Sequence, residues 1–302
     1  MKIYKNTEAE RDRIQACINK FGWTSDHNLD WFLVALNRPD GKPAFVEFDD
    51  GTGILFHKYS REWQIWSDPL CDKNLGADKI TEFAKFGLNQ NMDSVWCNYI
   101  SDGIYPLLKS KNELILDEID YSLDWPVLNM EKFDLALSGG HFKGFRNARN
   151  KFNREHKMEV VDFEKSYNDP LHDVINKWKK AALLKEEENY VYDFWYHNVV
   201  DSGFRGFKTA RILIIDGVPT GFNAGYEVVN NPQRFAGIIG IHDYSLTDLG
   251  LILWLEDLGW IKNAGYKELD MQGSDGGGLD FKMKFNPVIE RKTDTFSIQR
   301  KT

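Results

Sequence analysis

A dense group of cations at 143–157, KGFRNARNKFNREHK, is the first feature of the sequence that could do chemistry. It holds six Lys/Arg against one Glu, in a chain whose formal net charge is -8. On a helical wheel the apolar residues Phe145, Ala148 and Phe152 share one side, and Arg146 and Arg149 lie opposite. Guanidinium and amide groups suit phosphate and carboxylate contacts. We predict an amphipathic helix that binds an anion through Arg146, Arg149 and Lys151. A merely solvated basic face is the alternative.

A second group follows a predicted strand that ends near Asp270, in MQGSDGGGLDFKMKF at 271–285. Gln272, Ser274 and Asp275 lie where the strand gives way to irregular backbone, a common place for α/β active sites. The three glycines that follow permit close substrate approach or positive φ. We predict substrate contacts from Gln272 and Ser274 and a catalytic role for Asp275. A flexible turn without chemistry is the alternative.

His242 and Asp243 end another predicted strand, and histidine can serve as a general base near neutral pH. Neighbours in a strand point to opposite faces, so these two cannot act as a dyad within it. Asp243 is kept as a residue that orients an incoming amine. The other histidines lack metal-ligand spacing, and no serine-hydrolase or Walker motif occurs. We therefore expect neither a metal site nor serine-hydrolase chemistry.

The elements that must position these residues recur in the two halves of the chain. Hairpin patterns surround Asp50-Gly51 and Asp216-Gly217. In each half the hairpin is followed by a strand, a helix, a strand, a helix or turn, and a strand. This order is typical of a duplicated α/β domain. We predict domains at 1–135 and 136–302, with the basic helix at the junction.

Composition limits the class of protein. The chain has 302 residues and is 42% hydrophobic, but no apolar run reaches the roughly 18 to 20 residues that cross a bilayer. The N-terminus lacks the apolar core of a signal peptide, and the three cysteines form no C-x-x-C pair. We expect a soluble, cytoplasmic protein, with peripheral contact to a membrane surface left open. The net charge argues against wholesale coating of nucleic acid but allows a local anion site.

Three stretches together resemble one known family. They are WSDPL at 66–70, LDWPVLNMEKFDLALSGGHFKGFRNARNKFNRE at 123–155 and GSDGGGLDFKMKFNP at 273–287. Their order and spacing are similar to those of the phosphatidylglycerol lysyltransferase C-terminal domain family, which belongs with the Fem-type aminoacyltransferases. The resemblance implies an α/β (α+β) fold of two tandem GNAT-like acyltransferase domains, each with a mixed central sheet flanked by helices. The lipid-modifying members carry a multi-pass membrane region, which this sequence lacks.

The resemblance also implies roles for individual residues. Lys282 and Lys284 match lysines of the family stretch, and one of them could neutralise the oxyanion that forms when an amine attacks an ester. Because the first domain shapes the acceptor cleft in many Fem-type proteins, Asp68 is a substrate-binding candidate. A CoA-dependent GNAT domain usually has a Q/R-x-x-G-x-G/A phosphate loop. The equivalents here, SDPLCDKNLGAD at 67–78 and HDYSLTDLGL at 242–251, lack it, so no cofactor is expected.

We therefore expect a soluble transferase that moves an aminoacyl group, from aminoacyl-tRNA, to an amine or hydroxyl acceptor. A lipid head group, a cell-wall precursor or a small molecule would serve as acceptor. Another anionic substrate would use the basic helix equally well. An acyl-CoA-dependent N-acyltransferase and a non-catalytic, GNAT-like anion-binding protein remain as alternatives.

Overall fold

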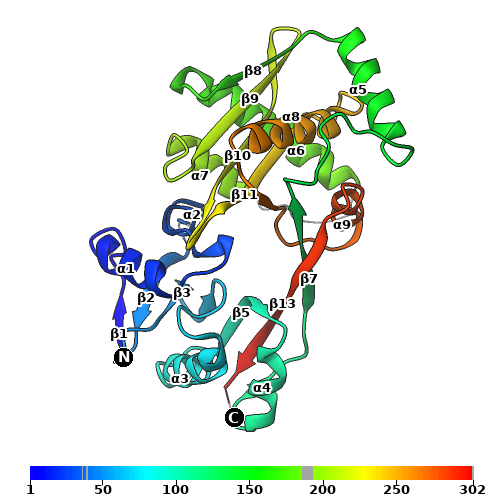
Figure 1. The fold of residues 1–302 in the computed structure, drawn as a ribbon. Coiled ribbons are helices and arrows are strands. Elements are labelled where there is room, and N and C mark those ends of the chain that lie inside the picture. The colour runs from blue at the N-terminus through cyan, green and yellow to red at the C-terminus, as the bar shows by residue number, and fades with distance from the viewer. Residues whose placement is uncertain (36, 39, 186–192, 301–302) are drawn as a thin grey trace. The chain divides into compact units, whose positions relative to one another are not determined.

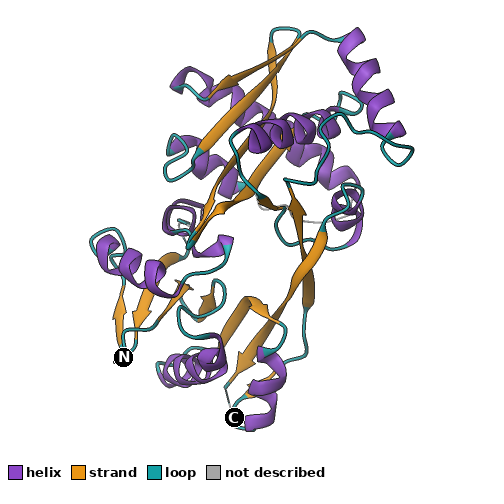
Figure 2. Cartoon of the chain, viewed as in Figure 1, coloured by secondary structure: helices purple, strands orange, loops and turns teal. Residues whose placement is uncertain are grey.

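A computed structural model describes residues 1–35, 37–38, 40–185 and 193–300 of the chain (Figures 1 and 2). These residues form two compact units. The first unit contains Met1–Val127, Val228–Asn231 and the chain from Met271 onward, and the second contains Leu128–Glu227 and Pro232–Asp270. The chain therefore leaves the first unit and returns to it.

The first unit is built on a mixed sheet with strand order β1-β2-β3-β4-β5-β13-β7, and the short β6 lies beside β13. β4 and β5 run parallel, whereas the other described pairs are antiparallel. The strands are β1 (Lys2–Tyr4), β2 (Lys42–Glu47), β3 (Gly53–Lys58), β4 (Glu62–Ile65), β5 (Ser94–Ser101), β6 (Ile115–Leu116), β7 (Tyr121–Asn129) and β13 (Val288–Gln299). The helices are α1 (Arg11–Phe21), α2 (Leu29–Ala35), α3 (Gly76–Asn89), α4 (Ile104–Lys111) and α9 (Gly276–Met283).

Helix α3 makes the crossover that the parallel pair β4 and β5 requires. Its Ile80, Phe83 and Ala84 recur at helical spacing and are completely buried. They belong to one core cluster with side chains from the sheet, including Phe56 and Phe296. Phe296 comes from β13, so the last strand contributes to the core of the first unit.

The second unit has its own series of strands, in the order β12-β11-β10-β9-β8. Here β11 and β12 are the parallel pair, and β9 runs antiparallel to both β8 and β10. The strands are β8 (Met158–Asp162), β9 (Thr209–Ile215), β10 (Val218–Val228), β11 (Asn231–His242) and β12 (Glu268–Asp270). The helices are α5 (Lys143–Glu155), α6 (Asn168–Lys185), α7 (Phe194–Asp201) and α8 (Leu249–Asn263).

The hairpin predicted at Asp216-Gly217 is confirmed. Both residues have positive φ, 52° and 84°, as a type I′ turn requires. The hairpin predicted at Asp50-Gly51 joins β2 to β3. Both halves follow the predicted order: β2-β3, β4, α3, β5, α4, β7 in the first, and β9-β10, β11, α8, β12, α9, β13 in the second.

The second series of elements, β9 to β13, differs from the first in the position of its last strand. Its last strand, β13, pairs with β5 and β7 of the first unit (Figure 1). The contact units therefore differ from the chain ranges 1–135 and 136–302. The proposal that those ranges are two duplicated domains stays a prediction about the ancestry of the chain.

Candidate active site

Three of the predicted residues meet where the segment that links β12 to α9 passes Lys282 of α9. The Lys282 ammonium donates a hydrogen bond to the backbone carbonyl of Gln272 at 3.0 Å and another to the Ser274 hydroxyl. Lys282 is half-buried, whereas Lys284, two residues further on, is exposed. The structure thus separates two lysines that the sequence treated alike, and we call Gln272, Ser274 and Lys282 the Lys282 cluster.

The backbone of this cluster is fixed by the strand beside it. Ser274 exchanges two backbone hydrogen bonds with Asp124 of β7, at 2.9 and 3.0 Å. Gly273 packs so closely on the Trp125 indole that a Cβ there would lie 2.8 Å from the ring. Gln272 has φ of 64°, a left-handed conformation that is uncommon outside glycine. Its side-chain amide donates to Ser25 Oγ at 3.1 Å. Such a constrained turn holds the partners of Lys282 in place.

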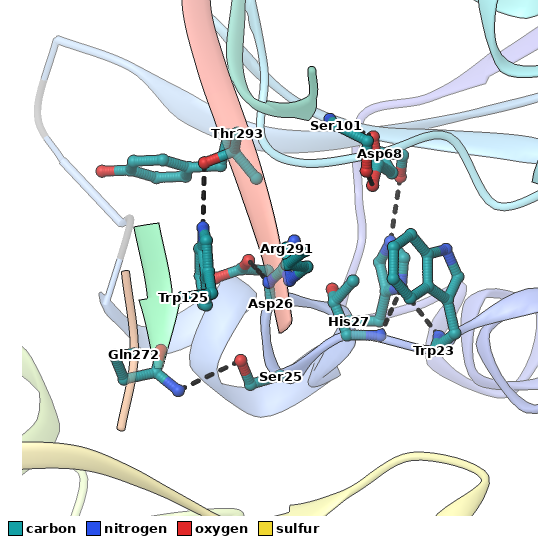
Figure 3. A network of polar contacts seen from close by, with 12 residues as sticks. Trp23, Ser25, Asp26, His27, Asp68, Ser101, Trp125, Gln272, Arg291 and Thr293 are labelled. Atoms are coloured by element: carbon teal, nitrogen blue, oxygen red, sulfur yellow. Dashed lines mark hydrogen bonds and ion pairs between the residues drawn. The ribbon is translucent and has the colours of Figure 1, made fainter. Parts of the chain in front are cut away.

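Beside the cluster lies a second group, which the sequence did not predict: Trp23, Asp26, Trp125 and Arg291, here called the Arg291 group (Figure 3). Arg291 Cζ lies 3.6 Å from the centroid of the Trp125 ring and 5.5 Å from that of Trp23. Asp26 Oδ2 is 3.6 Å from Arg291 Nη2. The Trp125 indole donates to Thr293 Oγ1 at 2.9 Å, which fixes the ring on β13.

His27 shapes the segment that carries Trp23, Ser25 and Asp26, in which Ser25–His27 form a short 3₁₀ helix. Its Nδ1 accepts hydrogen bonds from the backbone N–H of Trp23 at 3.0 Å and of Thr24 at 3.4 Å. Its Nε2–H therefore donates to the backbone carbonyl of Asp68, at 2.9 Å (Figure 3). Burial lowers the pKa of His27 to about 4, so the imidazole is neutral near pH 7 and acts as a structural latch.

This latch predicts a loss of stability in acid. The ordinary histidine pKa is near 6.5, so His27 contributes fully above that pH, where both folded and unfolded chains are neutral. As the pH falls toward 4, the unfolded chain binds a proton that the folded chain does not. We expect the free energy of unfolding to fall by about 3 kcal/mol from this residue. Denaturant titrations at pH 7 and pH 4.5 measure most of this fall.

The matched variants are His27→Gln and His141→Gln, because His141 is exposed. His27→Gln should lower stability at pH 7 and flatten the fall with pH relative to wild type. His141→Gln should leave both unchanged. If the free energy of unfolding falls equally with pH in wild type and in His27→Gln, then His27 is not the source of the acid sensitivity.

Asp68 lies with the latch rather than with the Lys282 cluster. Its carboxylate accepts hydrogen bonds from the Ser101 backbone N–H at 2.9 Å and from the Ser101 hydroxyl at 2.6 Å. Burial raises the pKa of this carboxyl. These contacts give Asp68 a supporting role for the loop of His27. Substrate contact by Asp68 stays a prediction.

Asp243 and Asp275 are not part of the Lys282 cluster as the structure describes it. Asp243, in the second unit, accepts from Ser245 N–H at 2.9 Å and lies 3.2 Å from Lys177 Nζ. Burial acts to raise its pKa, but these two bonds outweigh burial and lower it, so the carboxylate is held ionised. Asp275 is the exposed residue before α9. Catalysis by either residue stays a prediction.

Helix α5 forms as predicted, but its arginines do not face outward as the amphipathic pattern suggested. Phe152 is buried against Leu249, Ile252 and Leu253 of α8. The Arg146 guanidinium donates to the backbone carbonyls of Leu137 and Gly139, and Arg149 donates to that of Leu135. Both arginines are thus half-buried and bonded to the preceding loop instead of facing fully outward, and anion binding by Arg146 and Arg149 stays a prediction.

Five exposed side chains of α5 form a different stripe. They are Lys143, Asn147, Asn150, Lys151 and Arg154. Their spacing of three or four residues places them along one side of the helix. We call this set the α5 stripe. Of the predicted anion-binding residues, only Lys151 belongs to it.

Sequence reasoning missed the Arg291 group because its members come from three separate segments. Trp23 and Asp26 lie between α1 and α2, Trp125 lies on β7 and Arg291 on β13. No spacing rule joins such positions. The one local signal was WTSDH at 23–27, a polar run between apolar helical patterns.

Two general observations cover the residues that the structure describes. Among them, no group of three or more His, Cys, Asp or Glu side chains is arranged to hold a metal ion. Within the same residues, no helix has the length and apolar character needed to span a membrane.

Solved structures place this architecture among tandem GNAT-fold proteins. The L-PGS structure from Bacillus licheniformis matches with a TM-score of 0.63 and 16% identity, over 96% of this chain and 91% of that one. A tandem GNAT protein from the clavulanic acid biosynthesis pathway matches with a TM-score of 0.60 and 9% identity, over 99% and 98%. FemX matches with a TM-score of 0.59 and 10% identity, over 98% and 97%. The fold is that of the tandem GNAT class.

The sequence match is narrower and identifies the family. The family described as phosphatidylglycerol lysyltransferase, C-terminal, matches residues 30–223, which is more than half of the chain. The chain belongs to this family. The matched segment includes α5 but ends before the Lys282 cluster. No curated protein matches the sequence.

Proposed function

We propose that this protein transfers an aminoacyl group from an aminoacyl-tRNA to an amine or hydroxyl acceptor. The observation that carries the proposal is the Lys282 cluster, an ammonium held by a hydroxyl and a carbonyl on a constrained turn. Family membership and the structural likeness to L-PGS and FemX support the same class of reaction.

The reaction needs little covalent chemistry from the protein. The acceptor nitrogen or oxygen attacks the ester carbonyl, a new bond to the acyl carbon forms, and the ester C–O bond breaks. The proton of the attacking group passes to the departing ribose oxygen. Negative charge builds up on the carbonyl oxygen in between, and an ammonium fixed nearby stabilises it. Lys282 is the residue to which we assign this task, with Ser274 and Gln272 as positioning residues.

The starts of the two crossover helices argue for tRNA rather than CoA as donor. In GNAT proteins a diphosphate is gripped at the start of such a helix. Gly76 at the start of α3 is covered by Ile104, whose side chain lies 2.9 Å from where a Cβ would be. At Gly250, near the start of α8, the His242 ring lies at 2.8 Å from that position. A bulky side chain thus lies over the first turn of each helix.

The α5 stripe supports tRNA as donor in a second way. It offers two lysines, an arginine and two asparagines on an exposed helix face. Such groups bind a phosphate backbone without reading bases. This gives a donor of any sequence a place to dock.

The direct test is a transfer assay with tRNA pools charged with single labelled amino acids and with simple amines as acceptors. We expect label to leave the tRNA faster with the protein than without it, and to appear on the amine. A parallel reaction with acetyl-CoA and the same amines detects free thiol. Release of CoA, with no loss of label from tRNA, would establish the CoA-dependent alternative. The absence of turnover with either donor would favour the binding protein.

A further inference from the structure

We propose that Arg291 is the recognition group for an anionic substituent, a carboxylate or a phosphate, on the acceptor. The assignment to an acceptor rests on the proposed function, but the anion site itself does not. Its first support is the way the guanidinium is held. One face lies 3.6 Å from the Trp125 centroid, and Trp23 lies at 5.5 Å. Aromatic rings hold guanidinium faces by cation–π attraction. A ligand must then meet the group at its edge.

That edge is unsatisfied in the protein as described. Neither Nη1 nor Nη2 of Arg291 has a hydrogen-bond partner, and both atoms are buried. The nearby carboxylate oxygen, Asp26 Oδ2, is 3.6 Å from Nη2, which is too long for a hydrogen bond. Burying charged donors without acceptors is unfavourable by several kcal/mol. A planar carboxylate or a phosphate offers two oxygens in the geometry that matches the two terminal nitrogens.

A second cation lies near Arg291. Lys73 Nζ lies 3.6 Å from the centroid of Trp23, so this ring contacts two cations, Lys73 and Arg291. Asp26 opposes them. Asp68 is a second carboxyl near these cations, and burial raises its pKa. His27, with a pKa lowered to about 4 by burial, adds no charge at pH 7. Two cations, Lys73 and Arg291, thus lie against the Trp23 ring, with Asp26 as the carboxylate that opposes them.

The position of Arg291 connects it to the proposed chemistry. In the register of β7 with β13, Arg291 pairs with Trp125, and Lys292 pairs with Asp124. Asp124 is the residue whose backbone holds Ser274, and Gly273 packs on the Trp125 ring. The amide of Gln272 bonds to Ser25, next to Asp26. An acceptor held at Arg291 by its anionic end would therefore lie beside Gln272, Gly273 and Ser274.

Anion binding can be measured without turnover. Wild-type protein is titrated with inorganic phosphate and with acetate at constant ionic strength, and binding is followed by calorimetry and tryptophan fluorescence. We expect saturable binding of at least one anion, and the preference between them identifies phosphate or carboxylate as the ligand group. Arg291→Lys keeps the charge but loses the two-pronged donor, so affinity should fall about tenfold. Lys292→Gln, an exposed neighbour on β13, should bind as wild type does.

Loss of Arg291 could also destabilise the fold, because Asp26 would be left buried. The double variant Asp26→Asn/Arg291→Gln removes both charges and keeps the test valid. If this double variant binds either anion as tightly as wild type does, or if wild type shows no saturable binding, the inference is overturned. Transfer assays with two acceptors connect the anion site to the reaction: one is an amine that carries a carboxylate, and the other is the same amine with that carboxylate converted to an uncharged amide. Arg291→Lys should raise KM for the carboxylate-bearing acceptor only, with kcat retained.

The two proposals can fail separately. Transfer that proceeds with no effect of Arg291→Lys on binding or KM would remove the anion site and leave the proposed function standing. Saturable anion binding that depends on Arg291, without transfer from any charged tRNA, would overturn the proposed function and leave the anion site standing.

Discussion

Replacing Lys282 with methionine is expected to lower the rate of aminoacyl transfer by about 10²- to 10³-fold at saturating donor. The ammonium is half-buried and held by the Gln272 carbonyl and the Ser274 hydroxyl, so its charge acts from a fixed position. Methionine keeps the apolar stem of the side chain and removes the ammonium, with its charge and its two hydrogen bonds. The reduction should appear mainly in kcat, with donor affinity close to wild type.

Lys284→Met is the matched control, because Lys284 is exposed two residues further along the chain. It should retain most of the transfer rate. Lys282→Arg should restore part of the rate, since it returns a positive charge with a different shape. A Lys284→Met variant that loses activity while Lys282→Met keeps it would assign the chemistry to the exposed lysine instead.

The second large effect is expected on tRNA binding. The triple variant Lys143→Glu/Lys151→Glu/Arg154→Glu should weaken binding of charged tRNA at least about 100-fold in moderate salt. These three residues are the cations of the α5 stripe. For each phosphate that the variant no longer binds, the dependence of log Kd on log salt should also fall by about one. Filter binding or fluorescence anisotropy across a salt series measures both quantities.

The comparison variant is Arg146→Gln/Arg149→Gln. Because these two side chains bond to the carbonyls of Leu135, Leu137 and Gly139, their removal should lower the melting temperature and affect tRNA binding little. The reverse pattern would show that the arginines bind the anion directly, as the sequence first suggested. Unchanged binding in the triple variant would remove α5 from the mechanism.

Helix α5 shows which features could be predicted from the sequence and which could not. Its apolar seam follows from helical spacing alone, and Phe152 is buried where that spacing puts it. The direction of Arg146 and Arg149 depends on a loop whose path no local pattern encodes. The carbonyls of that loop face the arginines because Leu137 adopts φ of 57° and Gly139 φ of 86°, which turns the loop back. Local periodicity predicted the helix, and tertiary context redirected its charges.

The same division holds for the site. Gln272 and Ser274 were predictable because a strand end followed by glycines marks irregular backbone, and Lys282 entered through a family resemblance. Arg291 could not be predicted as a candidate, because what distinguishes it is its contact with the rings of Trp23 and Trp125, which lie on distant segments. The recurrence of elements was also visible in the sequence, but hydrogen-bond partners across a sheet are not. The sequence therefore could not show that β13 lies between β5 and β7.

That placement of β13 has a consequence for biosynthesis. A ribosome delivers the chain from its N-terminus, and β1 to β7 emerge long before Val288–Gln299. Until those residues arrive, β5 and β7 lack the strand that separates them, and the core lacks Phe296 and Ile298. The second unit, by contrast, draws almost all of its residues from one continuous stretch, Leu128 to Asp270. The unit whose first strands are made early therefore keeps an open sheet edge until β13 has been synthesised.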